Sequence, residues 1–149
     1  MRHLRRVYQR PDGGIAVVLP AWDDGNSGFG KTDHETEAAF YEWAVTLNIP
    51  AEWINKGDVD VATLPAREFR QCWRYDGAQV KVDAALETVE RWRRIRTERD
   101  TRLAASDGPM LRANETGMQV QAWLAYRQAL RDVPLQPDPK AIVWPVPPQ

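Results

Sequence analysis

The strongest constraint on the fold is a run from Asp83 to about Ser106 that contains neither glycine nor proline. Three glutamates in this run each precede an arginine by four residues: Glu87 and Arg91, Glu90 and Arg94, and Glu98 and Arg102. Such acid-first pairs are neighbours on a helix surface and stabilise it by about 0.2–0.5 kcal/mol each. The run therefore predicts one helix of about 22 residues, roughly 33 Å long at 1.5 Å per residue, with Asp83 as its cap.

A second helix is predicted after a break at Ser106 to Asn114, which contains Gly108 and Pro109. The Asn114 side chain can cap this helix. Its apolar residues recur at helical spacing: Met118, Ala122, Ala125, Tyr126, Ala129, Leu130 and Val133. Two amphipathic helices joined by a short loop predict an antiparallel αα-hairpin over residues 83–132.

The chain closes on a Pro-rich tail, residues 133–149, with six prolines between Pro134 and Pro148. Proline lacks the amide donor that helices and inner strands need, so this tail is predicted to run extended, close to polyproline II. Trp144 lies inside it. A large aromatic on an extended segment predicts docking, either on the same domain or on a partner.

The first part of the chain, residues 1–82, carries two β-hairpin signals. Pro11-Asp12-Gly13-Gly14 separates Val7 to Arg10 from Ile15 to Leu19, and Asp76-Gly77 separates Trp73-Arg74-Tyr75 from Ala78 to Val82. Both are predicted as antiparallel ribbons of one small sheet. Between them, Thr32-Asp33-His34-Glu35 has the form of a capping box and predicts a helix that ends before Pro50, whereas 51–66 is predicted to be irregular.

These elements predict an α+β fold: small antiparallel β-hairpins with one helix, then an antiparallel αα-hairpin, then the extended Pro-rich tail. The 149 residues, 43% of them hydrophobic, suit one modest core. A formal net charge of −1 argues against a nucleic-acid binder, which needs surplus basic groups. No stretch reaches the roughly 20 apolar residues of a membrane span, and no apolar segment follows the basic N-terminus.

One motif points to a different class of protein. Gly25 to Thr32, GNSGFGKT, matches the P-loop pattern, in which backbone amides and a lysine bind phosphates. The Gly-rich pattern does not directly follow a predicted strand, and several carboxylates surround it. A P-loop domain also needs parallel strands joined by crossover helices, whereas the second half of the chain predicts a helical hairpin. We therefore expect a Gly-rich connection in which Thr32 caps a helix, with nucleotide binding as the less favoured alternative.

The remaining reactive side chains indicate neither a catalytic centre nor a metal or cofactor site. His3 and His34 are the two histidines and lack metal-ligand spacing. Cys72 has no adjacent histidine and is predicted to be a buried, inert thiol. We expect a protein that is not an enzyme.

Several motifs in residues 67–149 share an order with a known family. They are Phe69-Arg70-Gln71-Cys72-Trp73, then Trp92-x-x-Ile95-Arg96-x-x-Arg99-Asp100, then Trp123-x-x-Tyr126-Arg127-Gln128, and finally Trp144-Pro145. This region resembles the phage tail assembly chaperone domain, and its end is similar to the C-terminus of tail fibre assembly proteins. One departure is Gly108-Pro109 after Ser106-Asp107, where the family often has an aromatic residue.

The resemblance implies a non-enzymatic chaperone that binds a phage tail or tail fibre protein in the host cytoplasm during assembly. Its expected partner-binding residues are Trp92, Arg96, Arg99, Trp123, Tyr126, Arg127, Trp144 and Pro145. For each of them, packing or ion pairing within the domain, for example with Asp100 or Asp132, is the alternative reading. A structural component of the phage tail or baseplate, which would stay in the virion, is the alternative function. The oligomeric state is left open, a homo-oligomer included.

Overall fold

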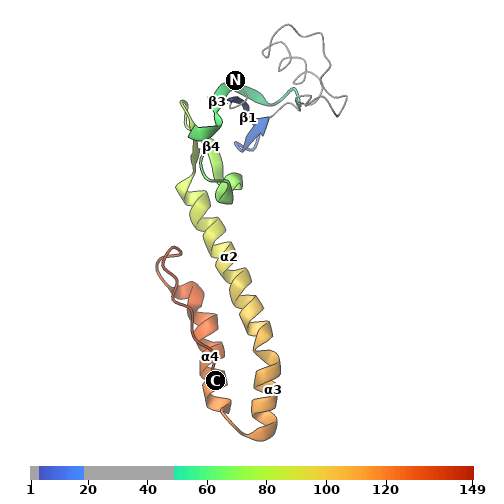
Figure 1. The fold of residues 1–149 in the computed structure, drawn as a ribbon, viewed down its shortest axis with the longest axis vertical. Coiled ribbons are helices and arrows are strands. Elements are labelled where there is room, and N and C mark those ends of the chain that lie inside the picture. The colour runs from blue at the N-terminus through green and yellow to red at the C-terminus, as the bar shows by residue number, and fades with distance from the viewer. Residues whose placement is uncertain (1–3, 19–48) are drawn as a thin grey trace. The chain divides into compact units, whose positions relative to one another are not determined.

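The computed structural model describes residues 4–18 and 49–149 (Figure 1). The chain divides into two compact units, Met1–Asp83 and Ala84–Gln149. The predicted helix after Thr32 and the P-loop-like segment Gly25 to Thr32 lie outside the described residues, as do His3 and His34.

The first unit is built on a three-stranded antiparallel sheet with strand order β2-β1-β3. β1 (Leu4–Gln9) and β2 (Ile15–Val18) form the first predicted hairpin, with Val7 opposite Val17. Gly13 takes a φ of 78° in the turn, and Asp12 Oδ1 accepts a hydrogen bond of 2.8 Å from the Gly14 amide. The hairpin is therefore confirmed, and its turn uses the residue types that led to the prediction.

The prediction that 51–66 is irregular was wrong, because β3 (Ile54–Asp60) pairs with β1 on the side away from β2. The register shifts between Val7 and Tyr8, where Gly57 adopts a φ of 94°. Arg6 and Asp58 join the two strands through an Nε–Oδ1 ion pair of 2.8 Å. A polar strand interrupted by a bulge carries little hydrophobic alternation, which is why the pattern did not reveal it.

The second predicted ribbon is confirmed as β4 (Trp73–Tyr75) and β5 (Val80–Val82). The expectation of one sheet was wrong: this ribbon forms a separate two-stranded sheet. The two sheets share a hydrophobic core of Val7, Ile15, Trp73 and Val80. Two 3₁₀ segments, η1 (Val61–Thr63) and η2 (Arg67–Cys72), lead from β3 into β4. Cys72 is buried, as predicted.

The second unit begins with the predicted long helix, α2 (Ala84–Ala105), of 22 residues. All three predicted acid-first pairs are present, with oxygen-to-Nε distances of 2.7 Å for Glu87–Arg91 and 2.8 Å for Glu90–Arg94 and Glu98–Arg102. Ile95 is buried on this helix, whereas Val89 is exposed. The local prediction therefore holds for the whole length of α2.

The predicted break at 106–114 was wrong. Residues Asp107–Thr116 form α3, so Asn114 lies inside a helix and caps nothing. The Ser106 amide donates to the Arg102 carbonyl and the Met110 amide donates to the Ser106 carbonyl, so helical hydrogen bonding continues across the junction. Pro109 stands in the first turn of α3, where a missing amide hydrogen is tolerated, and it bends the helical arm rather than ending it.

The hairpin turns at Gly117, which ends α3 with a φ of 71°, and returns through α4 (Val120–Asp132) and the 3₁₀ segment η3 (Val133–Leu135). The predicted apolar stripe was wrong in part. Tyr126, Leu130 and Val133 are buried, but Met118 and the three alanines at 122, 125 and 129 are exposed. None of the helices described here is long and apolar enough to cross a bilayer.

Candidate partner-binding surface

Arg127 on α4 ties the returning helix to the bend of the other arm. Its Nη1 donates to the Leu103 carbonyl at 3.2 Å, the Ser106 hydroxyl at 2.5 Å and an Asp107 carboxylate oxygen at 2.6 Å. The Ser106 residue is buried. Arg127, expected to bind a partner, thus makes its hydrogen bonds within the hairpin.

Trp123 and Tyr126 meet edge to face on α4, with ring centroids 5.8 Å apart and an interplanar angle of 85°. Tyr126 is buried, whereas Trp123 is half-buried. Trp123 also lines an open hollow of about 350 Å³ beside the turn of the hairpin. The other residues of this hollow are Pro109, Arg112, Ala113, Thr116, Met118 and Gln119.

The candidate residues on α2 differ in how far they are already engaged. Trp92 is half-buried, and Arg99 pairs with the neighbouring Asp100 at 2.7 Å. Arg96 is exposed, and no partner for it lies among the described residues. Arg96 is therefore the candidate arginine that remains available to a ligand on this part of the surface.

Two acidic side chains of α2, Glu87 and Glu90, are held ionised by neighbouring arginines. Arg93 and Arg94 both donate to Glu90 and lower the pKa of its carboxyl to about 2. Arg91 likewise holds the pKa of Glu87 below its usual value. At neutral pH the carboxylates of Glu87 and Glu90 are therefore ionised and paired with arginines.

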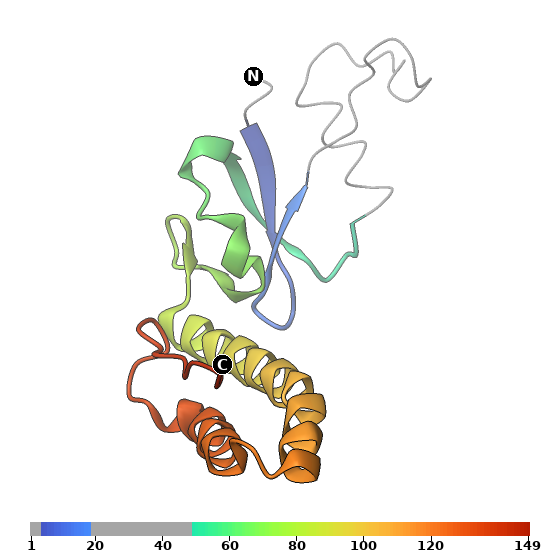
Figure 2. The ribbon, with the colours of Figure 1, turned by 60° about the horizontal axis from the view of Figure 1, so that its bottom comes forward.

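Trp144 docks on its own unit. The guanidinium of Arg102 lies over its ring, 4.4 Å from the centroid. The Gln136 side chain makes two hydrogen bonds to the backbone of Val143 in the tail. It accepts from the Val143 amide and donates to the Val143 carbonyl, both at 2.9 Å. Gln119 donates to the Gln149 carbonyl at 2.7 Å, so the tail reaches back to the turn of the hairpin. Figure 2 shows the tail between α2 and α4.

Exposure along the tail follows the period of a polyproline II helix, which has three residues per turn. Ile142, Pro145 and Pro148 are half-buried, whereas Val143 and Val146 are 74% and 81% exposed. Trp144 and Pro145, the tail residues predicted to bind a partner, are both half-buried. The two exposed valines and the anchoring residues Arg102 and Gln136 were not predicted. Spacing by three within the Pro-rich run is the signal that could have found the valines.

Within residues 4–18 and 49–149, no group of His, Cys, Asp and Glu side chains could hold a metal ion.

Residues 92–149 match a family model, and this region contains the end of α2, all of α3 and α4, and the tail. That model describes the phage tail assembly chaperone protein family. No curated protein and no solved structure matches the chain. The resemblance to phage tail assembly chaperones is therefore confirmed for residues 92–149, and the similarity to tail fibre assembly proteins stays a prediction.

The matched region begins at Trp92 and includes all eight candidate residues. The family match supports a role in phage tail assembly, with phage tail proteins as the implied partners.

Proposed function

We propose that the chain is a non-enzymatic assembly chaperone that binds a bacteriophage tail or tail fibre protein in the host cytoplasm. The observation that carries the proposal is the family match over residues 92–149. The arrangement of this region supports it: the helical hairpin is closed by Arg127, and the tail is fastened along it. Because such a scaffold is already ordered before it binds, it loses less conformational entropy when it binds a partner.

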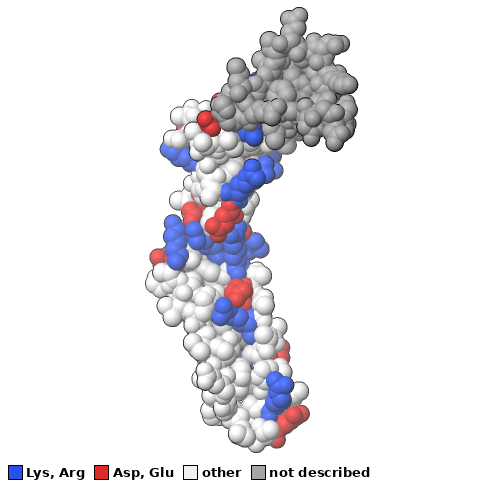
Figure 3. Space-filling view, viewed as in Figure 1, with Lys and Arg blue, Asp and Glu red and all other residues white. Residues whose placement is uncertain are grey.

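The surface proposed to hold the client is the turn end of the hairpin. Met118 is 68% exposed there and lines the hollow that the half-buried Trp123 also lines. Figure 3 shows one basic and one acidic patch at the edge of this end, whereas the rest of the face in view there is uncharged. An exposed methionine beside a half-buried tryptophan at a shallow hollow is typical of a surface that buries an apolar segment of another protein.

The predicted partner-binding residues divide into two roles in this proposal. Arg96 and Trp123 contact the client directly, because both leave part of their side chain open to solvent. Tyr126, Arg127 and Trp144 act by holding the hairpin and tail in place, since their contacts lie within the unit. Trp92, Arg99 and Pro145 are half-buried and are proposed to contact the client away from the hollow, on α2 and the tail.

A pull-down with the separately expressed tail proteins of the same phage tests this surface. The variant Met118→Ser is expected to lose client capture while keeping its helical circular dichroism spectrum. Leu135→Ser is the matched control, because Leu135 is 80% exposed and lies in η3, beyond the other end of α4. Equal capture by all three proteins would contradict the proposed surface.

A structural component of the tail would use the same surface as a permanent interface. Quantitative mass spectrometry of purified mature particles and of the infected-cell lysate separates the two functions. A chaperone is abundant in the lysate and missing from the particle, whereas a structural component has a fixed copy number per particle. Light scattering of the purified chain tests whether the surface instead joins copies of the chain in a homo-oligomer.

A further inference from the structure

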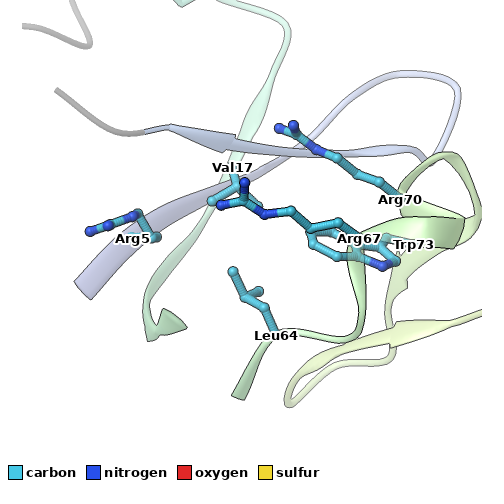
Figure 4. Close-up of a pocket in the computed structure, with 6 residues that line it drawn as sticks. All are labelled: Arg5, Val17, Leu64, Arg67, Arg70 and Trp73. Carbon is cyan, nitrogen blue, oxygen red and sulfur yellow. The ribbon is translucent and has the colours of Figure 1, made fainter. Parts of the chain in front are cut away.

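The first unit lies outside the family match and contains an arginine-lined pocket of about 210 Å³. Its lining residues are Arg5, Val17, Leu64, Arg67, Arg70 and Trp73 (Figure 4). Three of the six are cationic and none is acidic. The volume is several times the roughly 30 Å³ that one water molecule occupies in the liquid, so the pocket has room for a side chain.

Arg67 and Arg70 are presented by the short segment η2, whose other side is buried. Phe69, Cys72 and Trp73 are 6%, 2% and 2% exposed and fix the segment in the first unit. Arg67 and Arg70 flank the kink at Phe69, and both are exposed. Neither guanidinium has an ion-pair or hydrogen-bond partner among the described residues. Two guanidinium groups therefore line one pocket and are left available.

The pocket joins these charges to an apolar surface. Figure 4 shows the guanidinium groups of Arg67 and Arg70 on the same side of the Trp73 ring, and the ring nitrogen on the side away from them. Val17 and Leu64 contribute the apolar surface of the pocket, because the Trp73 ring is almost fully buried. Arg5 has a contact of its own, so the site does not depend on its being free.

We propose that this pocket binds a carboxylate carried by an acidic peptide segment of a partner protein. A guanidinium presents parallel N–H donors that match the two oxygens of a carboxylate. The methylene groups of a glutamate side chain can pack on Val17 and Leu64 while the carboxylate reaches Arg67 and Arg70. The pocket therefore combines the two features that recognise an acidic side chain on a peptide.

The charge of the surrounding unit favours a peptide over a nucleic acid. Residues 1–83 contain ten Lys and Arg and thirteen Asp and Glu, a formal net charge of −3. A polyanionic backbone needs several basic groups spread along its path, and a net acidic unit repels it. A single carboxylate needs only the local pair of arginines.

This inference does not rest on the proposed function. The chaperone surface is tested by a variant at Met118 in the second unit, whereas the pocket is tested by variants at Arg67 and Arg70 in the first. Failure of either proposal therefore leaves the other in place.

The experiment is an NMR titration of the full chain with a capped tripeptide that has leucine, glutamate and leucine. The same tripeptide with glutamine in the middle is the neutral comparison. We expect the glutamate peptide to shift the side-chain N–H signals of Arg67 and Arg70, and the glutamine peptide to leave them unmoved. The double variant Arg67→Gln and Arg70→Gln should bind the glutamate peptide at least about tenfold more weakly, because it loses charge-assisted hydrogen bonds.

The matched control is the double variant Arg112→Gln and Arg131→Gln, which makes the same change in charge at two exposed arginines of the second unit. It should bind the glutamate peptide like the unmodified chain. The proposal would be overturned by an equal loss in both double variants, by equal binding of the two peptides, or by no binding at all. Tighter binding of a single-stranded oligonucleotide, or of inorganic phosphate, to the same two arginines would also overturn it.

Discussion

The guanidinium carbon of Arg102 lies 4.4 Å from the centroid of the Trp144 ring. Arg102 also pairs with Glu98 on its own helix at 2.8 Å, so one arginine serves the helix surface and the tail together. The Pro-rich tail is thus attached to α2 by a cation–π contact that depends on a helix ion pair to orient the arginine.

The first prediction concerns this contact. The single variants Arg102→Gln and Trp144→Leu should each lower the free energy of unfolding, and the double variant should show a coupling of about 0.5–1 kcal/mol. Urea unfolding followed by circular dichroism measures all three. Deletion of residues 134–149 should lower the melting temperature for the same reason, and an unchanged melting curve would mean that the contact does not hold the tail.

The second prediction concerns Arg127, which donates to Leu103, Ser106 and Asp107 at the bend between α2 and α3. Arg127→Gln should lower the free energy of unfolding by about 1.5–3 kcal/mol, because it removes charge-assisted hydrogen bonds to the partly buried bend. Arg131→Gln on the same helix is the control, since Arg131 is exposed and has no partner among the described residues. Its effect should stay within about 0.5 kcal/mol, and equal losses in the two variants would contradict the assigned role.

Patterns within one element were predicted well from the sequence. The three Glu–Arg pairs of α2 and both hairpins follow from spacings of a few residues, which local physics determines. β3 was missed because its pairing depends on β1, far away in the chain, and on the Arg6–Asp58 ion pair rather than on alternation. Gly108 and Pro109 were misread as a break because a first-turn proline and a loop proline look alike in sequence.

The candidate surface was predictable only in part, for a related reason. An arginine or tryptophan in the sequence does not reveal whether its partner lies in the same chain. Arg127 makes its contacts inside the hairpin, whereas Arg96 on α2 has none among the described residues. The arginine pair of the pocket was not predicted, because Arg67 and Arg70 come to line one pocket with Val17, about 50 residues earlier in the chain, only in the folded unit.

The third prediction concerns the turn of the hairpin. Gly117 ends α3 with a φ of 71°, and a Cβ at this position would meet nothing within 4 Å. Gly117→Ala should therefore destabilise the protein through the backbone alone, by about 1–2 kcal/mol. Gly108→Ala is the matched control, because Gly108 lies inside α3 with equally open space around it and should stabilise the helix by about 0.5–1 kcal/mol. Thermal unfolding of the two variants should shift in opposite directions, and a shift of the same sign in both would refute the assignment of the turn.

The fourth prediction is a pH dependence that arises from Glu90. Arg93 and Arg94 lower the pKa of this carboxyl from 4.5 to about 2, so the folded state favours the ionised form. Because the folded pKa lies below the unfolded one, the stabilisation is complete above pH 4.5 and is lost as the pH falls towards 2. Glu90→Gln should therefore melt at a lower temperature than the unmodified chain at neutral pH, and the difference in melting temperature should shrink as the pH falls through this window.

The control is Glu115→Gln, which removes an exposed carboxylate without a partner among the described residues. Its melting temperature should stay close to that of the unmodified chain. A Glu90→Gln difference that does not change between neutral pH and pH 2 would show that the arginines do not hold this carboxylate.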